Sequence, residues 1–368
     1  MAPKIRVGVL FGGQSSEHEV SIVSARAVIA GLDHDKYEIV PIGITKDGRW
    51  LASGDPLATL ENLADPKLLP GGPSEKTSGA TAEETPSPTT LLSTTPPVDI
   101  PTGHVPPLDV VFPVLHGPRG EDGTVQGLFE LAGVPYVGCG VLASSVAMDK
   151  VMMKHAFAAA DLPQLPWLFL RRIDWERDPN HALERIESHL SYPMFVKPAN
   201  MGSSVGVSKA SDRATLEEGI NDAARYDRRI VVEQGISARE IEVSILGNDE
   251  PEASTPGEIL PSKEWYDYES KYLDGASQMV IPAPISHTLT EQVREMGKRA
   301  FTALDGAGLA RVDFLLDRET EKLYLNEANT MPGFTPVSMY AKMWEISGLS
   351  YNALLDRLIT LALERQKR

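Results

Sequence analysis

Short apolar runs alternate with segments of helical periodicity over the first third of the chain. Residues 5–11 and 108–115 are mostly apolar, as is typical of strands buried in a parallel sheet. A helical pattern follows the first run, and a second strand pattern spans 37–44. A short helix is predicted at 125–131. This order predicts a β-α-β start in an open parallel sheet that ends near Gly138.

Two further blocks mix strands, helices and loops in irregular order. The length of 368 residues is large for one core, so two or three domains are expected. The predicted elements are helices at 144–160, from Thr288 onward, at 337–346 and at 351–365, with strands at 193–198, 230–232 and 240–246. We therefore expect an α/β chain with α+β parts, divided at 1–138, 139–236 and 237–368.

Two apolar runs around a polar turn at 317–321 predict a β-hairpin. Because side chains alternate faces along a strand, Arg311 and Asp313 share a face, and so do Glu327 and Asn329. Folding at the turn would bring Asp313 opposite Glu327. Two carboxylates and an amide oxygen suit Mg²⁺ held together with substrate phosphates. The alternative is a solvated polar face, but the coincidence of these side chains favours a metal site.

The first strand leads through Gly12 and Gly13 into a predicted helix. Ser16 with Glu19 three residues later has the pattern of a capping box, and such a helix N-terminus can bind an anion. The glycine spacing does not match the dinucleotide-binding fingerprint. Glu17 would lie in the first helical turn, where the helix dipole stabilises a carboxylate. A capping role and a ligand-binding role for Glu17 are therefore both open.

A second candidate phosphate site follows the strand that ends at Lys197. The loop Gly202–Gly206 combines glycines, which permit close backbone approach, with two serine hydroxyls. It differs from a Walker A motif, and a flexible hairpin turn is the alternative. His116 ends the strand at 108–115, a usual place for ligand contacts, although a single His is more often structural. The strand edge after Glu233 could bind an adenine through its backbone.

Two stretches lack a regular period. Residues 53–107 are rich in Pro, Ser, Thr and Gly, which predicts a long surface excursion with little chemistry. Deleting much of 70–100 should leave activity largely intact. Residues 263–272 are rich in Tyr, Trp and Lys, and we interpret them as a candidate lid over a ligand. An aromatic interface loop is the alternative.

Composition restricts the partners. The formal net charge of −16 argues against non-specific binding to nucleic acid or anionic membranes, which need a basic surface. The single cysteine, Cys139, excludes an intramolecular disulfide, and its small apolar neighbours favour a packing role. We find neither a leader pattern nor an apolar run of the roughly 20 residues that a membrane helix needs. A cytoplasmic protein is expected.

These features together resemble the ATP-grasp ligases, and among them the D-alanine–D-alanine ligase family. The resemblance covers nearly the whole chain except 53–107, and it rests on seven separate motifs in the same order. They are Phe11 to Glu19, His116 to Gly127, Met148-Asp149-Lys150, Val196-Lys197-Pro198 with 202–206, Tyr266 to Tyr272, Arg311-Val312-Asp313, and Asn326 to Thr335.

The resemblance implies the three-domain ATP-grasp fold and specific site residues. The phosphates would be bound by Lys150, Lys197, Ser203 and Ser204. The other nucleotide contacts would come from Glu233, Gln234, Ile236, Glu240 and Lys271. The metal ligands would be Asp313, Glu327 and Asn329. Substrate contacts would come from Glu17, His116, Tyr272, Arg311, Gly333 and Ser338. The residues implied to be catalytic are Glu17, Ser203, Tyr272, Arg311 and Gly333.

The same resemblance implies a chemistry and its partners. ATP would phosphorylate one D-alanine, and the amine of a second D-alanine would attack the acyl phosphate, giving D-alanyl-D-alanine for peptidoglycan synthesis. Glu17 and His116 would bind the ammonium of the first D-alanine. Arg311 and the Gly333 N–H would stabilise the oxyanion. Two Mg²⁺ or Mn²⁺ ions are implied, with K⁺ as an additional candidate, and the implied assembly is a homodimer.

Two positions depart from the family pattern, and two rival functions follow. Gln234 replaces a lysine that is common after the hinge glutamate, and Pro336 precedes Ser338 where other residues are common. One rival is a ligase that joins D-alanine to D-lactate, against which Tyr272 argues. The other is a nucleotide-binding protein without catalysis, against which the complete metal-ligand set argues.

Overall fold

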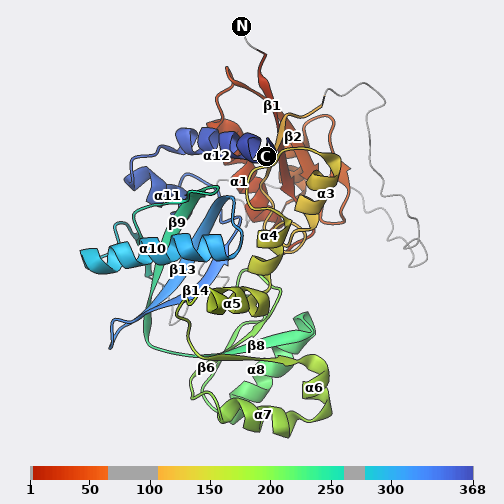
Figure 1. Cartoon of the computed structure of the whole chain (residues 1–368). Coiled ribbons are helices and arrows are strands. Elements are labelled where there is room, and N and C mark those ends of the chain that lie inside the picture. The colour runs from red at the N-terminus through yellow and green to blue at the C-terminus, as the bar shows by residue number, and fades with distance from the viewer. Residues whose placement is uncertain (1–2, 65–106, 261–277, 368) are drawn as a thin grey trace, which may run out of the picture.

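The computed structural model describes residues 3–64, 107–260 and 278–367, which form three β-sheets (Figure 1). Figure 1 shows a sheet with β1 and β2 at the top, a sheet with β9, β13 and β14 in the middle, and a sheet with β6 and β8 at the bottom. The predicted mixture of a parallel α/β part with α+β parts is confirmed by this arrangement.

The N-terminal sheet has the strand order β3-β2-β1-β4. Strand β1 pairs in parallel with β2 and β4, whereas β3 is antiparallel to β2. The β-α-β start predicted from the apolar runs is therefore confirmed. The strands are β1 (Ile5–Gly12), β2 (Tyr37–Ile44), β3 (Trp50–Leu51) and β4 (Val110–Pro113), and the helices are α1 (His18–Gly31), α2 (Pro56–Leu63) and α3 (Thr124–Ala132).

Gly12 makes the turn from β1 into α1 possible. Its φ angle is +90°, a region that favours glycine. A Cβ atom on Gly12 would lie 2.2 Å from the carbonyl oxygen of Ile44 on the neighbouring strand. The close approach of the two backbones therefore requires glycine, and it directs the start of α1 toward the end of the sheet.

The sheet at the bottom of Figure 1 is formed by the middle part of the sequence and is called the central sheet for that reason; it is antiparallel, with the strand order β5-β8-β6-β7. Its strands are β5 (Trp167–Arg171), β6 (Met194–Pro198), β7 (Ser208–Ala210) and β8 (Arg229–Gln234), and the adjoining helices are α6 (Arg172–Arg177), α7 (Pro179–Glu187) and α8 (Arg213–Tyr226). Apolar side chains of these helices and strands form a core of their own.

The large sheet has the order β12-β11-β9-β13-β14, with β10 paired to β9. Its strands are β9 (Ala238–Gly247), β10 (Glu252–Ala253), β11 (Gly257–Leu260), β12 (Gln278–Val280), β13 (Gly308–Asp317) and β14 (Leu323–Asn329). The helices of this region are α4 (Val141–Met148), α5 (Lys150–Ala159), α10 (His287–Ala303), α11 (Met339–Ile346) and α12 (Tyr351–Gln366). Strands β13 and β14 are the predicted hairpin, and Asp313 lies opposite Glu327 as expected.

Two helix starts differ from the prediction. Helix α1 has Glu17 rather than Ser16 at its N-cap, and the Glu17 side chain makes no capping hydrogen bond. The Glu19 carboxylate pairs with the Lys46 ammonium at 2.5 Å. The N-cap of α10 is Ser286, two residues before the expected cap at Thr288, and its hydroxyl accepts a hydrogen bond from the Leu289 N–H.

The helix predicted at 144–160 is divided in two. Asp149 has extended backbone angles between α4 and α5, and its carboxylate accepts hydrogen bonds from the N–H groups of Val151 and Met152. Asp is a favoured N-cap residue, so the break has a local cause. The excursion expected at 53–107 also begins with regular structure, because α2 lies within it and buries Leu60. Residues 65–106 lie outside the described residues.

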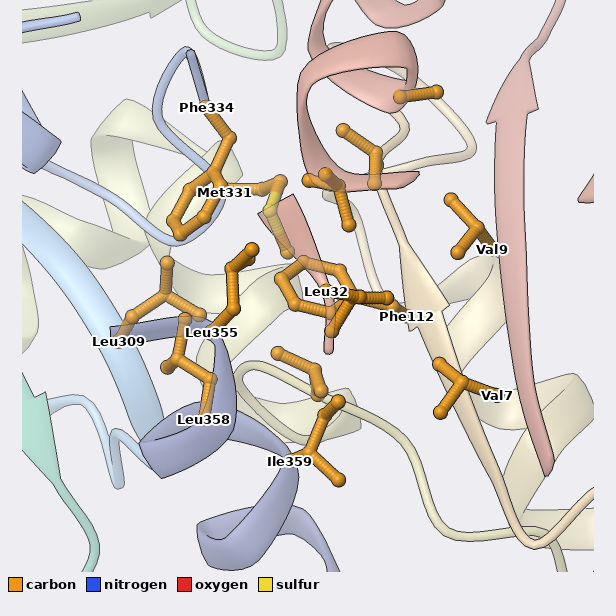
Figure 2. Packing of buried hydrophobic residues seen from close by; sticks show 14 of the residues in the cluster. Val7, Val9, Leu32, Phe112, Leu309, Met331, Phe334, Leu355, Leu358 and Ile359 are labelled. Atoms are coloured by element: carbon orange, nitrogen blue, oxygen red, sulfur yellow. The ribbon is translucent and has the colours of Figure 1, made fainter. Parts of the chain in front are cut away.

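The C-terminal helix α12 completes the core of the N-terminal sheet. Figure 2 shows Leu355, Leu358 and Ile359 from α12 beside Leu309, with Val7, Val9 and Phe112 of the sheet in the same cluster. Met331 and Phe334, from the loop after β14, belong to this cluster as well. The two ends of the chain are therefore packed into one hydrophobic core.

Arg365 provides a polar link between the same two regions. Its guanidinium lies 4.3 Å from the centre of the Tyr136 ring and donates hydrogen bonds to the carbonyl oxygens of Gly138 and Tyr136. A guanidinium over an aromatic face is an attractive contact.

Among the described helices, none combines the length and the apolar composition that crossing a membrane requires.

Candidate active site

One cavity of about 830 Å³ is lined by strand residues of the central and large sheets and, from the N-terminal region, by Glu17, His116 and Glu121, which lie in loops or at a helix start beside the N-terminal sheet. Every predicted site residue within the described ranges lines this cavity. They are Glu17, His116, Lys150, Lys197, Ser203, Ser204, Glu233, Gln234, Ile236, Glu240, Arg311, Asp313, Glu327, Asn329, Gly333 and Ser338. Lys271 and Tyr272, which were expected in the lid, lie outside the described residues.

The hairpin holds its polar side chains through strand register. Asp313 lies opposite Glu327, and Arg311 lies opposite Asn329. The Arg311 guanidinium donates two bonds to Asp313, from Nε to Oδ1 at 2.8 Å and from Nη2 to Oδ2 at 2.7 Å. The Asn329 amide also donates to Asp313 Oδ2, at 3.0 Å. The register shifts after Asp313, which is the geometry of a β-bulge and is common next to active sites.

Glu242 extends this row of charges onto a third strand. It lies opposite Asp313 on β9 and is 3.2 Å from the Nε atom of Arg311. Burial tends to lower the pKa of Arg311, but the carboxylates of Asp313 and Glu242 outweigh it and raise the pKa well above its ordinary value. The guanidinium is therefore a permanent cation. The sequence analysis missed Glu242, although its alternation with Glu240 on one strand face was a usable signal.

The loop between β6 and β7 has the backbone shape of an anion-binding turn. Ser203 and Ser204 have φ angles of 48° and 59°, which is uncommon for residues other than glycine. Consecutive residues of this kind turn their N–H groups toward one side, as in anion-binding nests. Backbone bonds from Val205 to Gly202 and from Val207 to Ser204 stabilise the turn. Strained angles of this kind gather at ligand sites.

Glu17 links the N-terminal helix to this loop. The Ser203 hydroxyl donates a hydrogen bond to Glu17 Oε1 at 2.5 Å, across 186 residues of sequence. On the other side, a Cβ atom on Gly117 would lie 2.8 Å from Glu17 Oε2. The carboxylate is buried, with 6% of the residue exposed. Glu17 is thus fixed against the cavity wall by groups from two separate loops.

His116 lies in the same wall and is buried. Its Nδ1 donates to the carbonyl oxygen of Met331 at 3.0 Å, and its Nε2 is 3.4 Å from the Ser24 hydroxyl. Burial lowers the pKa of His116, although the nearby Glu17 carboxylate and the Met331 bond oppose this effect. The imidazole is therefore neutral at pH 7, and it orders the loop that carries Met331.

Glu121 is a wall residue that was not among the predicted site residues. Its Oε2 accepts from the Gly117 N–H at 2.5 Å, and its Oε1 accepts from the Met331 N–H at 3.2 Å. Burial and the neighbouring Glu17 raise the pKa of Glu121 to about 8. The carboxyl connects two loops that are 210 residues apart in sequence. Only the folded chain brings these groups together, so local sequence held no signal.

The lysines of the cavity have defined partners. Lys150 donates from Nζ to the Met201 carbonyl oxygen at 2.7 Å, beside the serine loop. The Lys197 ammonium donates to Glu233 Oε2 at 2.8 Å, and the second oxygen of Glu233 is 3.1 Å from the Lys154 ammonium. Burial tends to raise the pKa of Glu233, but the charges of Lys154 and Lys197 lower it to about 2. Lys154 was not predicted from sequence.

Gln234 and Ser338 are two further predicted residues in the cavity wall. The Gln234 amide bonds to the backbone of Ser191, accepting from its N–H at 2.8 Å and donating to its carbonyl at 2.6 Å. Ser338 is the N-cap of α11, and its hydroxyl accepts from the Thr335 N–H at 3.0 Å. A Cβ atom on Gly333 would lie 3.4 Å from that hydroxyl, so the Gly333 backbone adjoins Ser338.

Cys139 is buried away from this chemistry. Burial raises the pKa of its thiol to about 11, and the Sγ atom is 3.4 Å from the carbonyl oxygen of Leu309. A thiol with a raised pKa is a poor nucleophile at neutral pH. The packing role expected for Cys139 agrees with this position.

Two family profiles match the chain and together cover most of it. The profile described as "D-ala D-ala ligase N-terminus" matches residues 6–139, and "D-ala D-ala ligase C-terminus" matches 156–360. The chain belongs to the D-alanine–D-alanine ligase family. This result confirms the resemblance found in the sequence motifs.

Curated members of the D-alanine–D-alanine ligase family match over almost their full length. A D-alanine–D-alanine ligase of Heliobacterium modesticaldum is 49% identical over 366 residues, covering 99% of this chain and 96% of the relative. One from Ruminiclostridium cellulolyticum is 51% identical over 365 residues, covering 98% of this chain and 96% of the relative. The family assignment therefore applies to the whole chain.

Solved structures of the family have the same fold. The D-alanine-D-alanine ligase of Coxiella burnetii gives a TM-score of 0.79 at 35% identity, covering 100% of this chain and 96% of that one. The VanG D-Ala:D-Ser ligase of Enterococcus faecalis gives 0.80 at 33% identity, covering 98% and 100%. The expected ATP-grasp architecture is confirmed by these likenesses.

The donor chemistry of the hairpin fits a divalent cation of the kind that the D-alanine–D-alanine ligase family implies. Asp313, Glu327 and Asn329 line one cavity and offer two carboxylates and one amide oxygen. In residues 3–64, 107–260 and 278–367, no group of three or more His, Cys, Asp or Glu side chains could hold a metal by itself. A set of this size suits Mg²⁺, which usually takes one or two carboxylates together with phosphate oxygens.

Proposed function

We propose that this chain is an ATP-dependent D-alanine–D-alanine ligase that supplies D-alanyl-D-alanine for peptidoglycan synthesis. The observation that carries the proposal is the single cavity in which a strained serine loop, two lysines and the carboxylate hairpin face one another. Near-full-length relatives with that name support the choice of substrate. In this reaction the terminal phosphoryl group of ATP passes to the carboxylate of one D-alanine, and ADP leaves.

In this proposal, the serine loop and two lysines bind the phosphates. Lys150 already lies against the loop backbone at Met201, and Lys197 lies at the end of the adjacent strand. Ser203 and Ser204 add hydroxyls and N–H groups in a nest-like turn. These fixed donors would orient the transferred phosphoryl group, which is the main catalytic task in phosphoryl transfer.

The nucleoside end of the cavity is assigned to the strand edge after β8. Glu233, Gln234 and Ile236 line it, and Glu240 lies close by on β9. The Gln234 side chain is bound to Ser191, so its contribution would be through the backbone. Lys271 retains its proposed nucleotide role on sequence grounds only.

Asp313, Glu327 and Asn329 would hold two Mg²⁺ or Mn²⁺ ions, and K⁺ remains an additional candidate. When bound, the divalent ions would offset the negative charge of the phosphates. The register that places Asp313 opposite Glu327 supports this assignment. Arg311 donates two hydrogen bonds to Asp313 and so fixes the orientation of that carboxylate.

The first D-alanine would bind with its ammonium at Glu17 and its carboxylate toward the phosphates. Glu17 is fixed by Ser203, and His116 orders the wall beside it. The amine of the second D-alanine would then attack the acyl carbon. A C–N bond forms, the C–O bond to phosphate breaks, inorganic phosphate leaves, and the amine loses a proton.

The negative charge that develops on the acyl oxygen needs preorganised donors. Arg311, a permanent cation, and the backbone N–H of Gly333 are the donors that we assign to this task. Ser338, beside Gly333, would bind the carboxylate of the second D-alanine. Tyr272 is expected to connect the lid to this network through Glu17.

The proposal is tested by measuring ADP release. The purified chain with ATP and Mg²⁺ should release ADP when D-alanine is added and produce D-alanyl-D-alanine in equal amount, as measured by mass spectrometry. Equimolar D-serine or D-lactate should give less mixed product than D-alanyl-D-alanine. Absence of D-alanine-dependent ADP release would contradict the ligase, and a predominant mixed product would instead indicate the D-serine or D-lactate activity.

We also propose a cytoplasmic homodimer with domains at 1–138, 139–236 and 237–368. The exposed leucines Leu128 and Leu131 on α3 and Leu142 on the neighbouring α4 support a contact between two copies. Light scattering should give twice the chain mass of 40.0 kDa. Leu131→Glu should shift the mass to that of a monomer, and an unchanged dimer would exclude this surface.

A further inference from the structure

Glu233 carries two ammonium groups on one carboxylate. Phe195 lies opposite Glu233 in the pairing of β6 and β8, and Lys197 is two residues farther along β6. Lys197 and Glu233 therefore project from the same face of the central sheet. The third member, Lys154, comes from α5, one helical turn after Lys150.

The two lysines differ in their exposure to the cavity. The Lys154 side chain is 3% exposed, and its ammonium lies 5.9 Å from the centre of the Trp167 ring. The Lys197 side chain is 15% exposed and lines the cavity. Lys154 is thus confined behind the wall, whereas Lys197 can turn its ammonium from Glu233 toward a ligand.

The second ammonium keeps the buried Glu233 carboxylate paired when Lys197 moves away from it. If Lys197 were the only partner of Glu233, its movement to a phosphate would leave a buried carboxylate without a counter-charge. Such a group is strongly destabilising, so the nucleotide would bind less tightly. With Lys154 on the other oxygen, Glu233 remains paired whichever position Lys197 takes.

We infer that Lys154 is a positioning residue, a fixed counter-ion to Glu233 that leaves Lys197 free to move between Glu233 and the nucleotide phosphate. The inference rests on the proposed role of Lys197 as a phosphate ligand. Lys154 touches neither substrate nor metal, and its effect is transmitted through Glu233. The low pKa of Glu233 agrees with a carboxylate that is ionised throughout.

The test compares Mg²⁺–ADP binding by calorimetry with steady-state kinetics in the full chain. Lys154→Met should weaken Mg²⁺–ADP binding by about tenfold or more, because Glu233 then retains Lys197. It should raise the KM for ATP and leave the KM for D-alanine nearly unchanged. Lys298→Met is the matched control, since Lys298 pairs with Glu295 on the exposed surface of α10.

A second variant separates positioning from general support of the fold. In the double variant Lys154→Met with Glu233→Gln, a neutral amide replaces the carboxylate that would retain Lys197. Mg²⁺–ADP binding should therefore recover to that of Glu233→Gln alone. The comparison of these two variants also remains decisive if Lys154→Met by itself does not fold. Binding in the double variant that is about tenfold weaker than in Glu233→Gln would overturn the inference.

Lys197→Met distinguishes failure of the inference from failure of the proposed site. Normal Mg²⁺–ADP binding in Lys197→Met would refute the phosphate role of Lys197, and the inference would fall with it. If Lys197→Met binds weakly but Lys154→Met binds like the Lys298→Met control, the site stands and only the inference is refuted.

Discussion

Glu327 has a position that strand pairing determines. It lies opposite Asp313, whose carboxylate is already held by Arg311 and Asn329. A cation that bridges the two strands would therefore depend on Glu327 for the second carboxylate. The negative charge, rather than the shape of the side chain, is what the site requires from this residue.

Glu327→Gln keeps the shape and removes the charge. Loss of a residue that only orients a metal ligand typically costs about 10- to 100-fold, so loss of the ligand Glu327 should lower both turnover and Mn²⁺ affinity by at least this much. Mn²⁺ binding in the presence of ADP can be followed by electron paramagnetic resonance. Glu319→Gln, on the exposed turn of the same hairpin, is the control and should behave like the parent. Unchanged Mn²⁺ affinity in Glu327→Gln would refute the metal assignment.

Glu121 makes the stability of the fold depend on pH. Its pKa rises from the ordinary 4.5 to about 8 in the folded chain, so folding takes up a proton between these values. The unfolding free energy contributed by this group therefore falls as pH rises from about 4.5 to about 8. Glu121→Gln should remove part of that decline in urea titrations across this range.

Glu217→Gln is the control for this measurement, because Glu217 lies on the exposed face of α8. It should leave the pH profile of stability unchanged. A Glu121→Gln variant with the same slope as the parent would show that Glu121 is ionised in the folded chain and that its pKa is not raised.

Local pattern identified some of these residues and missed others for a physical reason. Asp313 and Glu327 were found because strand alternation and one turn fix their relation over a short segment. Lys154 and Glu121 were missed because their partners, Glu233 and Met331, lie far away in sequence. No periodicity within a segment records which distant segment will pack against it.

At the scale of elements, Asp149 separates two helices and also connects them to the central sheet. Its Oδ1 caps α5, while its Oδ2 accepts from the Asn200 amide at 2.9 Å and pairs with Arg229. The periodicity of 144–160 predicted one continuous helix because the apolar residues keep their helical spacing on both sides of Asp149. The capping preference of Asp was the local signal that should have divided it.

Asp149→Ala should remove both the cap and the buried pair. Loss of a buried partner costs about 3–5 kcal/mol, whereas a simple N-cap costs about 1 kcal/mol. Asp178→Ala, at the exposed N-cap of α7, removes only a cap and serves as the matched control. Urea unfolding should therefore show a clearly larger loss for Asp149→Ala. Equal losses in the two variants would mean that the contacts with Asn200 and Arg229 add nothing to stability.

At the scale of the whole molecule, α12 returns the end of the chain to its beginning. Leu355 and Leu358 are fully buried in the cluster that contains β1 and β4 residues, whereas the central sheet has a separate core. The apolar period of 351–365 predicted the helix correctly. The same period could not predict which sheet the helix packs against, because any sheet with an apolar face could bury its apolar side.

Leu358→Ala tests whether these cores respond separately. Truncating a fully buried Leu costs about 2–5 kcal/mol, so the unfolding free energy of the N-terminal core should fall by this amount. Hydrogen exchange should then accelerate in β1 and β4 while β6 and β8 keep their protection, since their core contains no α12 residue. Ile346→Ala, at a position 52% exposed on α11, should change exchange in neither sheet. Equal acceleration in all four strands would instead show that the chain opens as one cooperative unit, and the C-terminal helix would then stabilise the entire active-site cavity.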